Sequence, residues 1–409
     1  MKKNVALLLA ILFWAPFAGV AQSGSTLKTG VWRAVLKNKG GELPFGLEVT
    51  QTGSTYTAFA LNGAERLRFD SVTLKGDSVR FAIDIFEAEI RAKVDGNTLR
   101  GFWRRRRTGT NYTSLPFEAQ HGVTYRFTGS TETPKINVTG TWATTFRSET
   151  DSTVSVGIFE QKGNKLTGTF LTTTGDYRYL EGNVVGDSLL LSTFDGTHLY
   201  LFKARRKPDN TLVGGYWSGE SGYESWTARF DPKAKLPDAT SLTYLKPGYK
   251  TIAFTFPDLK GKPVSLTDAR FKNKVVVVQI LGSWCPNCMD ETNFLSPWYK
   301  KNKNRGVEIV GLAYEKSAEL AESAPKIQRM IDRFKIDYPV VLAGTNVKSE
   351  ASKTLPMLNQ VVGFPTMIVI DKKGTVRQIH TGFTGPGTGN YYDAFVEEYN
   401  RLIDKLVKE

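Results

Sequence analysis

The sequence predicts a multidomain chain: an N-terminal all-β antiparallel region, duplicated and barrel-like, followed by a C-terminal α/β domain. Three observations predict this: short alternating apolar runs before residue 232, an internal repeat with an offset of 110 residues, and a change of hydrophobic pattern after residue 237. At 409 residues the chain is long enough for two or three domains. With 40% hydrophobic and 23% charged residues it can bury sizeable cores, which excludes a disordered chain.

Residues 1–21 have the pattern of an export signal. Lys2 and Lys3 precede an apolar run over residues 5–20, and small residues stand before a cleavage point after Ala21. The apolar run is short for a membrane-spanning helix, which favours a cleaved signal over an uncleaved anchor. We therefore expect an exported protein in the periplasm of a Gram-negative bacterium, with no stable membrane insertion after signal cleavage.

Residues 22–128 and 129–231 are expected to form two β-rich repeats. Apolar residues alternate with polar neighbours in two clear runs: Phe45, Leu47 and Val49, and Val154, Val156 and Ile158. Glycine-containing turns are expected at residues 75–77, 95–97 and 162–164. Short strands with turns this frequent are typical of antiparallel sheet.

The repeat is visible in short motifs. Gly30-Val-Trp32 recurs as Gly140-Thr-Trp142, and Gly76-Asp-Ser78 recurs as Gly186-Asp-Ser188. Each repeat is long enough for about eight strands, which suffices for one up-and-down barrel or for half of a larger closed sheet. The Gly-x-Trp motif is similar to that of the lipocalin and avidin barrels. We expect Trp32 and Trp142 to close the ends of their own cores rather than to line a ligand cavity.

The formal charge of +14 is spread along the chain, so nucleic acid is not an expected partner. The exception is a run of four arginines at residues 104–107. Its simplest explanation is a solvated edge strand that discourages pairing between sheets, with two arginines on each face. The alternative is a docking patch for an acidic partner.

Residues 232–244 are expected to be a linker, and residues 245–409 an α/β domain. The continuous apolar run at residues 274–281 is typical of a strand that is buried on both faces. The elements expected after it are a helix at 288–303, a strand at 307–313, a helix at 318–334, strands at 338–342, 366–370 and 376–380, and a helix at 391–407. This order predicts a mixed sheet covered by helices.

Cys285 and Cys288 are the only cysteines, so a disulfide-stapled scaffold and a multi-cysteine metal site are excluded. They stand where the first buried strand runs into a helix. Unpaired N–H groups and the positive end of the helix dipole favour a thiolate there, which lowers the pKa of Cys285 below about 8.5. We expect Cys285 to attack a substrate disulfide and Cys288 to resolve the mixed disulfide. No histidine has ligand spacing to the cysteines, so we expect no metal and no cofactor.

From about residue 247 the chain resembles the TlpA/ResA-like thiol–disulfide oxidoreductases of the thioredoxin superfamily. The resemblance rests on Phe254-Thr-Phe-Pro-Asp258, Gly261-Lys-Pro-Val-Ser-Leu266, Gly282-Ser-Trp-Cys-Pro-Asn-Cys288 and Val362-Gly-Phe-Pro-Thr366. It implies a thioredoxin-like fold over residues 245–409 with a redox-active Cys285–Cys288 disulfide. The Trp-Cys-Pro-x-Cys form is especially similar to the cytochrome c maturation thioredoxins.

The resemblance also implies a substrate-binding surface. Pro365 matches the family's cis-proline, which faces the disulfide. A cis bond between Phe364 and Pro365 lets neighbouring backbone groups face an extended substrate segment. Trp284, before the first cysteine, is expected to belong to the same surface.

A third implication concerns the proton of Cys288. Ordinary thioredoxins carry a buried acid six residues before the first cysteine, where this chain has Gln279. The TlpA/ResA-like proteins carry a glutamate three residues after the second cysteine, which is Glu291 here. A half-buried Glu291 with a raised pKa is expected to take that proton; the alternative is an ordinary surface glutamate. Asp290 is expected to be exposed to solvent.

These observations predict an exported thiol–disulfide oxidoreductase, working as a reductase on protein substrates. An oxidising compartment requires a membrane electron donor to keep the cysteines reduced, and this chain does not encode one. The alternative is a binding protein whose β-repeats hold a ligand or partner, with the thioredoxin-like domain as an accessory.

Overall fold

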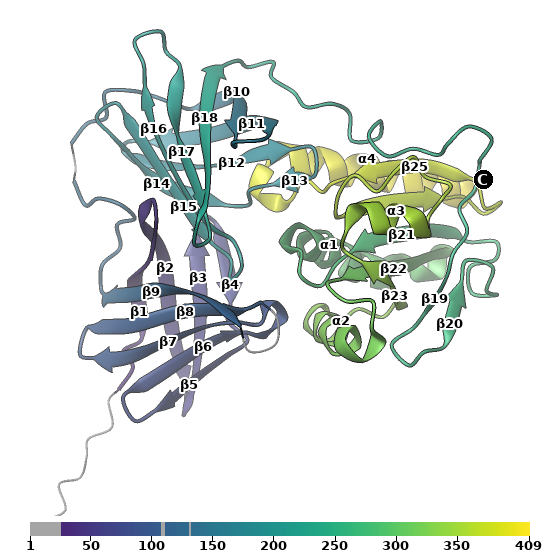
Figure 1. Ribbon diagram of the computed structural model, residues 1–409, viewed down its shortest axis with the longest axis horizontal. Coiled ribbons are helices and arrows are strands. Elements are labelled where there is room, and N and C mark those ends of the chain that lie inside the picture. Colours follow the sequence, from purple (N-terminus) through teal and green to yellow (C-terminus); the bar gives the residue numbers. More distant parts are fainter. Residues whose placement is uncertain (1–25, 108–110, 131) are drawn as a thin grey trace, which may run out of the picture.

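The computed structural model describes residues 26–107, 111–130 and 132–409. The expected export signal, residues 1–21, lies outside the described residues. In the described ranges, no helix has both the length and the apolar character needed to cross a membrane. Two β-units lie on one side of the molecule and an α/β domain lies on the other (Figure 1).

The first β-unit, as described, is a curled antiparallel sheet of nine strands in the order β4-β3-β2-β1-β9-β8-β7-β6-β5. Its elements are β1 (Gly30–Asn38), β2 (Gly41–Thr52), β3 (Thr55–Asn62), β4 (Glu65–Arg68), β5 (Ser71–Lys75), β6 (Ser78–Ile83), the 3-10 helix η1 (Asp84–Phe86), β7 (Ala88–Asp95), β8 (Thr98–Arg106) and β9 (Tyr112–His121). The predicted turns at residues 75–77 and 95–97 join β5 to β6 and β7 to β8.

The second β-unit is a closed barrel. Its elements are β10 (Gly140–Arg147), β11 (Ser152–Lys162), β12 (Lys165–Thr172), β13 (Gly175–Asp176), β14 (Leu180–Val185), β15 (Ser188–Phe194), β16 (Leu199–Arg206), β17 (Leu212–Ser218) and β18 (Gly222–Phe230). In the described part of the chain, pairing of β11 with β12 closes eight strands, and β13 extends β12 outside the barrel. The interior is packed with apolar side chains, many of them aromatic rings in mutual contact: Phe146, Phe170, Tyr177, Phe202, Tyr216 and Trp226.

The two units confirm the duplicated all-β architecture that the sequence predicts. Trp32 and Trp142 are both buried, and each indole N–H donates to the backbone carbonyl four residues upstream, at 3.1 and 2.8 Å. The glycine two residues before each tryptophan has a positive φ, +107° at Gly30 and +121° at Gly140, which favours glycine at that position. Both tryptophans belong to their own unit's core, as expected.

The alternating apolar run in β11 does not face the barrel interior as expected. Phe159 belongs to the buried barrel core, so the residues of opposite parity, including Val154, lie on the outer face. Val154 is 61% exposed. Val156 is buried because it borders a small hollow shared with the linker and the C-terminal domain. The outer face of β11 is therefore apolar where it meets another part of the chain.

The arginine run does not form a solvated edge. Its strand, β8, is hydrogen-bonded to β7 on one side and to β9 on the other. Arg104 donates to the carboxylate of Glu89 at 2.6 Å, and both Arg104 and Arg106 approach the ring of Tyr112. Pairing within its own unit therefore explains at least one face of this run.

The C-terminal domain, as described, contains a five-stranded mixed sheet in the order β23-β22-β21-β24-β25. Its elements are β19 (Thr255–Pro257), β20 (Pro263–Ser265), β21 (Val275–Leu281), α1 (Pro286–Asn302), η2 (Lys303–Arg305), β22 (Val307–Glu315), α2 (Leu320–Phe334), β23 (Val340–Thr345), α3 (Lys348–Thr354), β24 (Thr366–Ile370), β25 (Val376–Thr381), η3 (Pro386–Thr388) and α4 (Asn390–Lys408). The α/β prediction is confirmed, and every residue of β21 is buried. The short elements β19, β20 and α3 were not predicted.

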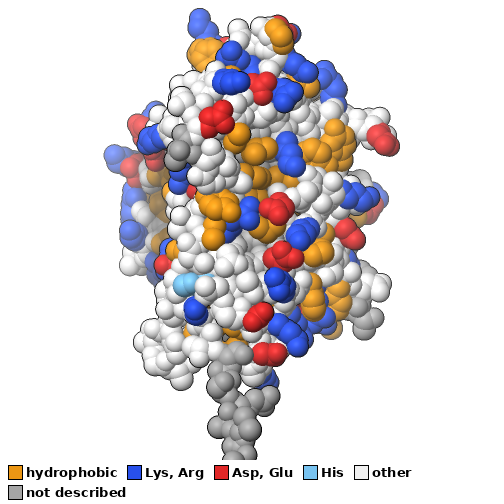
Figure 2. All heavy atoms as spheres, turned by 90° about the vertical axis from the view of Figure 1, so that its left-hand side faces the viewer, with side chains coloured by type: hydrophobic (Ala, Val, Ile, Leu, Met, Phe, Trp, Pro, Cys, Tyr) orange, Lys and Arg blue, Asp and Glu red, His pale blue; other side chains and the backbone are white. Residues whose placement is uncertain are grey.

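Charge on the β-units is mixed. On the face turned away from the C-terminal domain, Lys and Arg side chains lie among Asp and Glu side chains (Figure 2). This distribution agrees with the diffuse positive charge that the sequence predicts.

Candidate active site

The two cysteines lie where β21 ends and α1 begins. Cys285 is the N-cap residue of α1, and Pro286 occupies the first turn. The Sγ atom of Cys285 accepts the N–H of Cys288 at 3.2 Å, which satisfies one of the helix's otherwise unpaired donors. Negative charge on Cys285 is therefore stabilised by the start of the helix.

Cys285 and Cys288 form a disulfide, with 5.2 Å between their Cα atoms. Cys285 is 5% exposed and Cys288 is fully buried. A substrate sulfur can therefore approach only Cys285, which supports the predicted order of attack.

Trp284, Phe364 and Pro365 lie together beside this disulfide. The Trp284 indole N–H donates to the carbonyl of Tyr314 at 2.8 Å, and its ring meets Phe364 edge-on at 5.5 Å. The Phe364 carbonyl oxygen lies 3.7 Å from the Sγ atom of Cys285. The Phe364–Pro365 bond is cis, as the resemblance implies. The structure thus brings the three predicted substrate-binding residues to the outer cysteine.

Glu291 is fully buried on α1, more deeply than the half-buried position that we expected. Burial raises the pKa of its carboxyl group to about 8. Oε2 accepts the side-chain N–H of Gln279 at 2.9 Å, and the Gln279 carbonyl accepts the Tyr338 hydroxyl at 3.1 Å. Oε1 has no partner among the described residues. Gln279 therefore orients the carboxyl group of Glu291 and leaves one oxygen free to exchange a proton.

Glu315 is a second buried carboxyl group, which the sequence analysis missed. It lies at the end of β22 and accepts the backbone N–H of Ser283 at 2.7 Å and its hydroxyl at 2.8 Å. Burial raises its pKa. These bonds fix the loop that carries Trp284. A glutamate directly after the apolar run at residues 307–313 was the available signal.

The prediction of a solvent-exposed Asp290 was wrong. Its side chain is 18% exposed and forms an ion pair with Arg178 of the second β-unit. Arg178 is shared with Glu65 and Asp195, so one guanidinium faces three buried carboxylates. Burial therefore outweighs the attraction of Arg178 and raises the pKa of Asp290 to about 6.

Asp290 also borders a hollow of about 890 Å³ between both β-units and the C-terminal domain. Its lining includes Pro286 and Met289 from the start of α1, Arg178 from the barrel and Arg333 from α2. The hollow therefore adjoins the helix that carries the cysteines.

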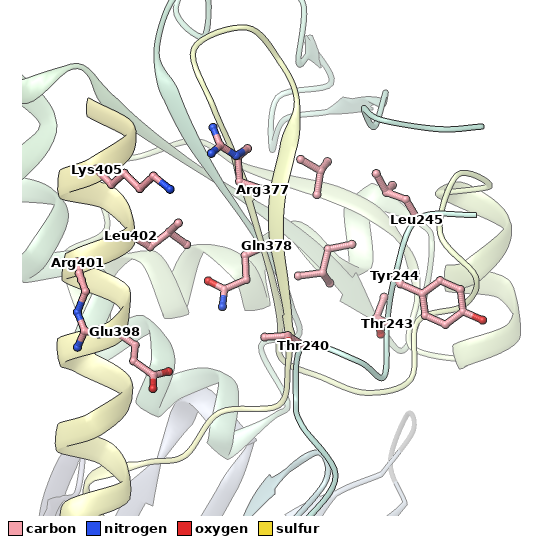
Figure 3. A pocket seen from close by; sticks show the side chains of 12 residues that line it. Thr240, Thr243, Tyr244, Leu245, Arg377, Gln378, Glu398, Arg401, Leu402 and Lys405 are labelled. Atoms are coloured by element: carbon pink, nitrogen blue, oxygen red, sulfur yellow. The ribbon is translucent and has the colours of Figure 1, made fainter. Parts of the chain in front are cut away.

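A separate groove of about 720 Å³ lies between the linker, β25 and α4 (Figure 3). Arg377, Arg401 and Lys405 line it together with Glu398. Neither cysteine nor the cis-proline loop contributes to its lining, so it is distinct from the redox site.

Comparison with known proteins follows the same division of the chain. Residues 233–394 match the family described as Redoxin. The thiol-disulfide oxidoreductase ResA of Bacillus subtilis is 29% identical over 182 residues, which cover 44% of this chain and 84% of that protein. ResA of Halalkalibacterium halodurans is 28% identical over 157 residues, 38% of this chain and 76% of that protein.

Among solved structures, the thioredoxin domain of a thiol-disulfide oxidoreductase from Bacteroides vulgatus is 27% identical. The match covers 37% of this chain and 99% of that domain, with a TM-score of 0.28. The family match lies entirely within residues 233–394, as do the disulfide at the start of α1 and the cis-proline loop. The C-terminal domain of this chain is a TlpA/ResA-like thiol–disulfide oxidoreductase of the thioredoxin superfamily.

Proposed function

We propose that this protein is exported and reduces disulfides in protein substrates, with Cys285 as the attacking thiol and Cys288 as the resolving thiol. The observation that carries the proposal is the position of the Cys285–Cys288 pair. Its outer sulfur lies beside the cis Phe364–Pro365 bond, and a buried carboxyl group lies on the same helix.

In the first step, the Cys285 thiolate attacks one sulfur of the substrate disulfide. A new S–S bond joins Cys285 to the substrate, the substrate's own S–S bond breaks, and the released substrate thiolate takes up a proton. Stabilisation of the Cys285 thiolate by the start of α1 lowers the barrier to this attack.

In the second step, Cys288 loses its proton and attacks the Sγ atom of Cys285. The Cys285–Cys288 disulfide forms and the second substrate thiol leaves, so two electrons have passed to the substrate. Glu291 takes the proton from Cys288. A carboxyl group with a pKa of about 8 lies close to the operating pH, which is what a general base requires.

Export is supported by the signal-like residues 1–21, and a Gram-negative periplasm is the compartment we propose. Protein thiols are the substrates proposed, because the redoxin domain and the ResA relatives belong to thiol–disulfide chemistry. A membrane electron donor outside this chain returns the disulfide to the dithiol state. The Trp-Cys-Pro-x-Cys motif favours cytochrome c maturation as the setting.

The alternative, a ligand-binding protein, is not favoured. Aromatic rings fill the interior of the second β-unit, and Trp32 closes the core of the first. The β-units therefore offer packed cores where that alternative requires a cavity.

Differential alkylation tests the roles of the cysteines. After reduction with dithiothreitol, the full chain should expose two titratable thiols and should catalyse insulin reduction. Near neutral pH, iodoacetamide should label Cys285 much faster than Cys288, because Cys285 alone is exposed and lies at the helix start. Cys285→Ser should abolish turnover, and equal or preferential labelling of Cys288 would contradict the assignment.

A further inference from the structure

The β12–β13 hairpin of the barrel reaches the redox site (Figure 1). A Cβ atom on Gly363, in the cis-proline loop, would lie only 2.5 Å from the Cγ2 atom of Thr174. A Cβ atom on Gly382, after β25, would lie 2.8 Å from the carbonyl carbon of Thr174. The tip of the hairpin is therefore seated directly against the backbone on the substrate side of Pro365.

Two hydrogen bonds join the same hairpin to the rest of the site. The side-chain N–H of Asn287 donates to the carbonyl of Asp176 at 3.2 Å, and the backbone N–H of Gly385 donates to the Asp176 carboxylate at 2.7 Å. Asn287 stands between the two cysteines, and Gly385 lies just before α4. The hairpin is thus held on both sides of the disulfide.

Arg178 anchors the base of the hairpin. It forms ion pairs with Asp290 on α1 and with Glu65 of the first β-unit, and it donates to the carbonyl of Pro286 at 3.4 Å. Its side chain is 7% exposed. A buried guanidinium with several partners holds the hairpin more firmly than a surface contact would.

From this geometry we propose that the β12–β13 hairpin determines substrate specificity by occupying the side of the groove where an extended polypeptide would lie. This inference rests on the proposed function. A polypeptide substrate aligns its main chain with the backbone beside Pro365, and Thr174 already covers that backbone at Gly363. Small disulfides need only the Cys285 sulfur, whereas a polypeptide disulfide reacts when the hairpin has moved away.

Rate constants for two substrates test the proposal. The reduced full chain and its Thr174→Gly/Asp176→Ala variant are mixed with hydroxyethyl disulfide and, separately, with an unfolded polypeptide that carries one disulfide. The variant should gain rate on the polypeptide and little on the small disulfide. If the parent hairpin is withdrawn a tenth of the time, the gain approaches about tenfold.

The matched control is Ser221→Gly/Glu220→Ala, at the exposed tip of the β17–β18 hairpin. It should change neither rate. A folded Thr174→Gly/Asp176→Ala variant with an unchanged ratio of the two rates would overturn the proposal. A parent chain that reduces neither disulfide would instead refute the proposed function.

Hydrogen exchange provides a measurement that needs no altered hairpin. The Cys288→Ala chain is joined to the polypeptide as a mixed disulfide through Cys285, or to mercaptoethanol in the control. Amides of residues 172–178 should exchange faster in the polypeptide adduct than in the control. Equal exchange in the two adducts would show that the polypeptide binds without displacing the hairpin.

Discussion

At the residue scale, the proton of Cys288 is the point on which Glu291 can be tested. Glu291→Gln keeps the shape of the side chain and removes its titration. Attack by Cys285 should be nearly unchanged, because its thiolate depends on the start of α1. Resolution at pH 7 should slow by up to about 10²-fold, the low end for general-base catalysis, since a thiol ionises partly unaided.

Stopped-flow measurement of the resolution step across pH provides the check. In the parent, the rate should rise as Glu291 ionises near pH 8, and this rise should be absent in Glu291→Gln. Mixed disulfide should accumulate in the variant at pH 7 and disappear at higher pH. Glu397→Gln, at an exposed position on α4, is the control. Superimposable profiles for parent and Glu291→Gln would assign Glu291 a structural role only.

Burial of Glu291 also predicts how stability depends on pH. Its carboxyl pKa is about 8 in the folded chain against 4.5 ordinarily, so the folded state binds more protons between these values. The free energy of unfolding should therefore fall as pH rises from 4.5 to 8, by about 1.4 kcal/mol per pH unit from this group alone. Below pH 4.5 and above pH 8 the contribution is constant.

Urea unfolding of the oxidised chain at pH 5 and pH 8 measures this dependence. Glu291→Gln should lose much less stability than the parent over that interval, because the amide does not titrate. An equal pH dependence in both proteins would show that the pKa of Glu291 is not raised in the folded chain.

At the scale of single elements, the hairpin between β12 and β13 depends on Arg178. Arg178→Ala leaves the carboxylates of Glu65, Asp195 and Asp290 without their shared cation in a buried position. Such a loss typically lowers the free energy of unfolding by about 3–5 kcal/mol. Arg205→Ala is the control, because Arg205 and its partner are largely exposed, and it should lower it by at most about 1 kcal/mol.

Urea unfolding of the oxidised full chain compares these two variants. Losses of similar size in Arg178→Ala and Arg205→Ala would contradict the role given to the buried cluster.

At the scale of the whole molecule, residues 244–409 should fold without the β-units. The five-stranded sheet has its own core around β21, in which all seven residues are buried. The fragment should therefore show cooperative unfolding and should reduce hydroxyethyl disulfide. It should also lose the discrimination against polypeptides, since it lacks the hairpin. An unfolded or inactive fragment would show that the β-units are part of the active unit.

Local patterns in the sequence were sufficient to predict much of the fold. The buried run at residues 274–281, the helix after it and the turns at residues 75–77 and 95–97 all depend on neighbours in sequence. The direction of β11 was predicted wrongly, because an apolar alternation does not reveal which face meets the barrel core. Val156 is buried by the linker region instead.

The sequence by itself determined the chemistry: two cysteines at a strand-to-helix junction define a redox pair, because helix geometry brings residues i and i+3 together. Only the tertiary structure decided what surrounds that pair. Arg178 and Asp290 are 112 residues apart, and each alone reads as an ordinary surface charge. Their burial follows from the docking of the barrel on α1. A contact over such a distance leaves no periodicity in the chain, since it depends on how separately folded units pack.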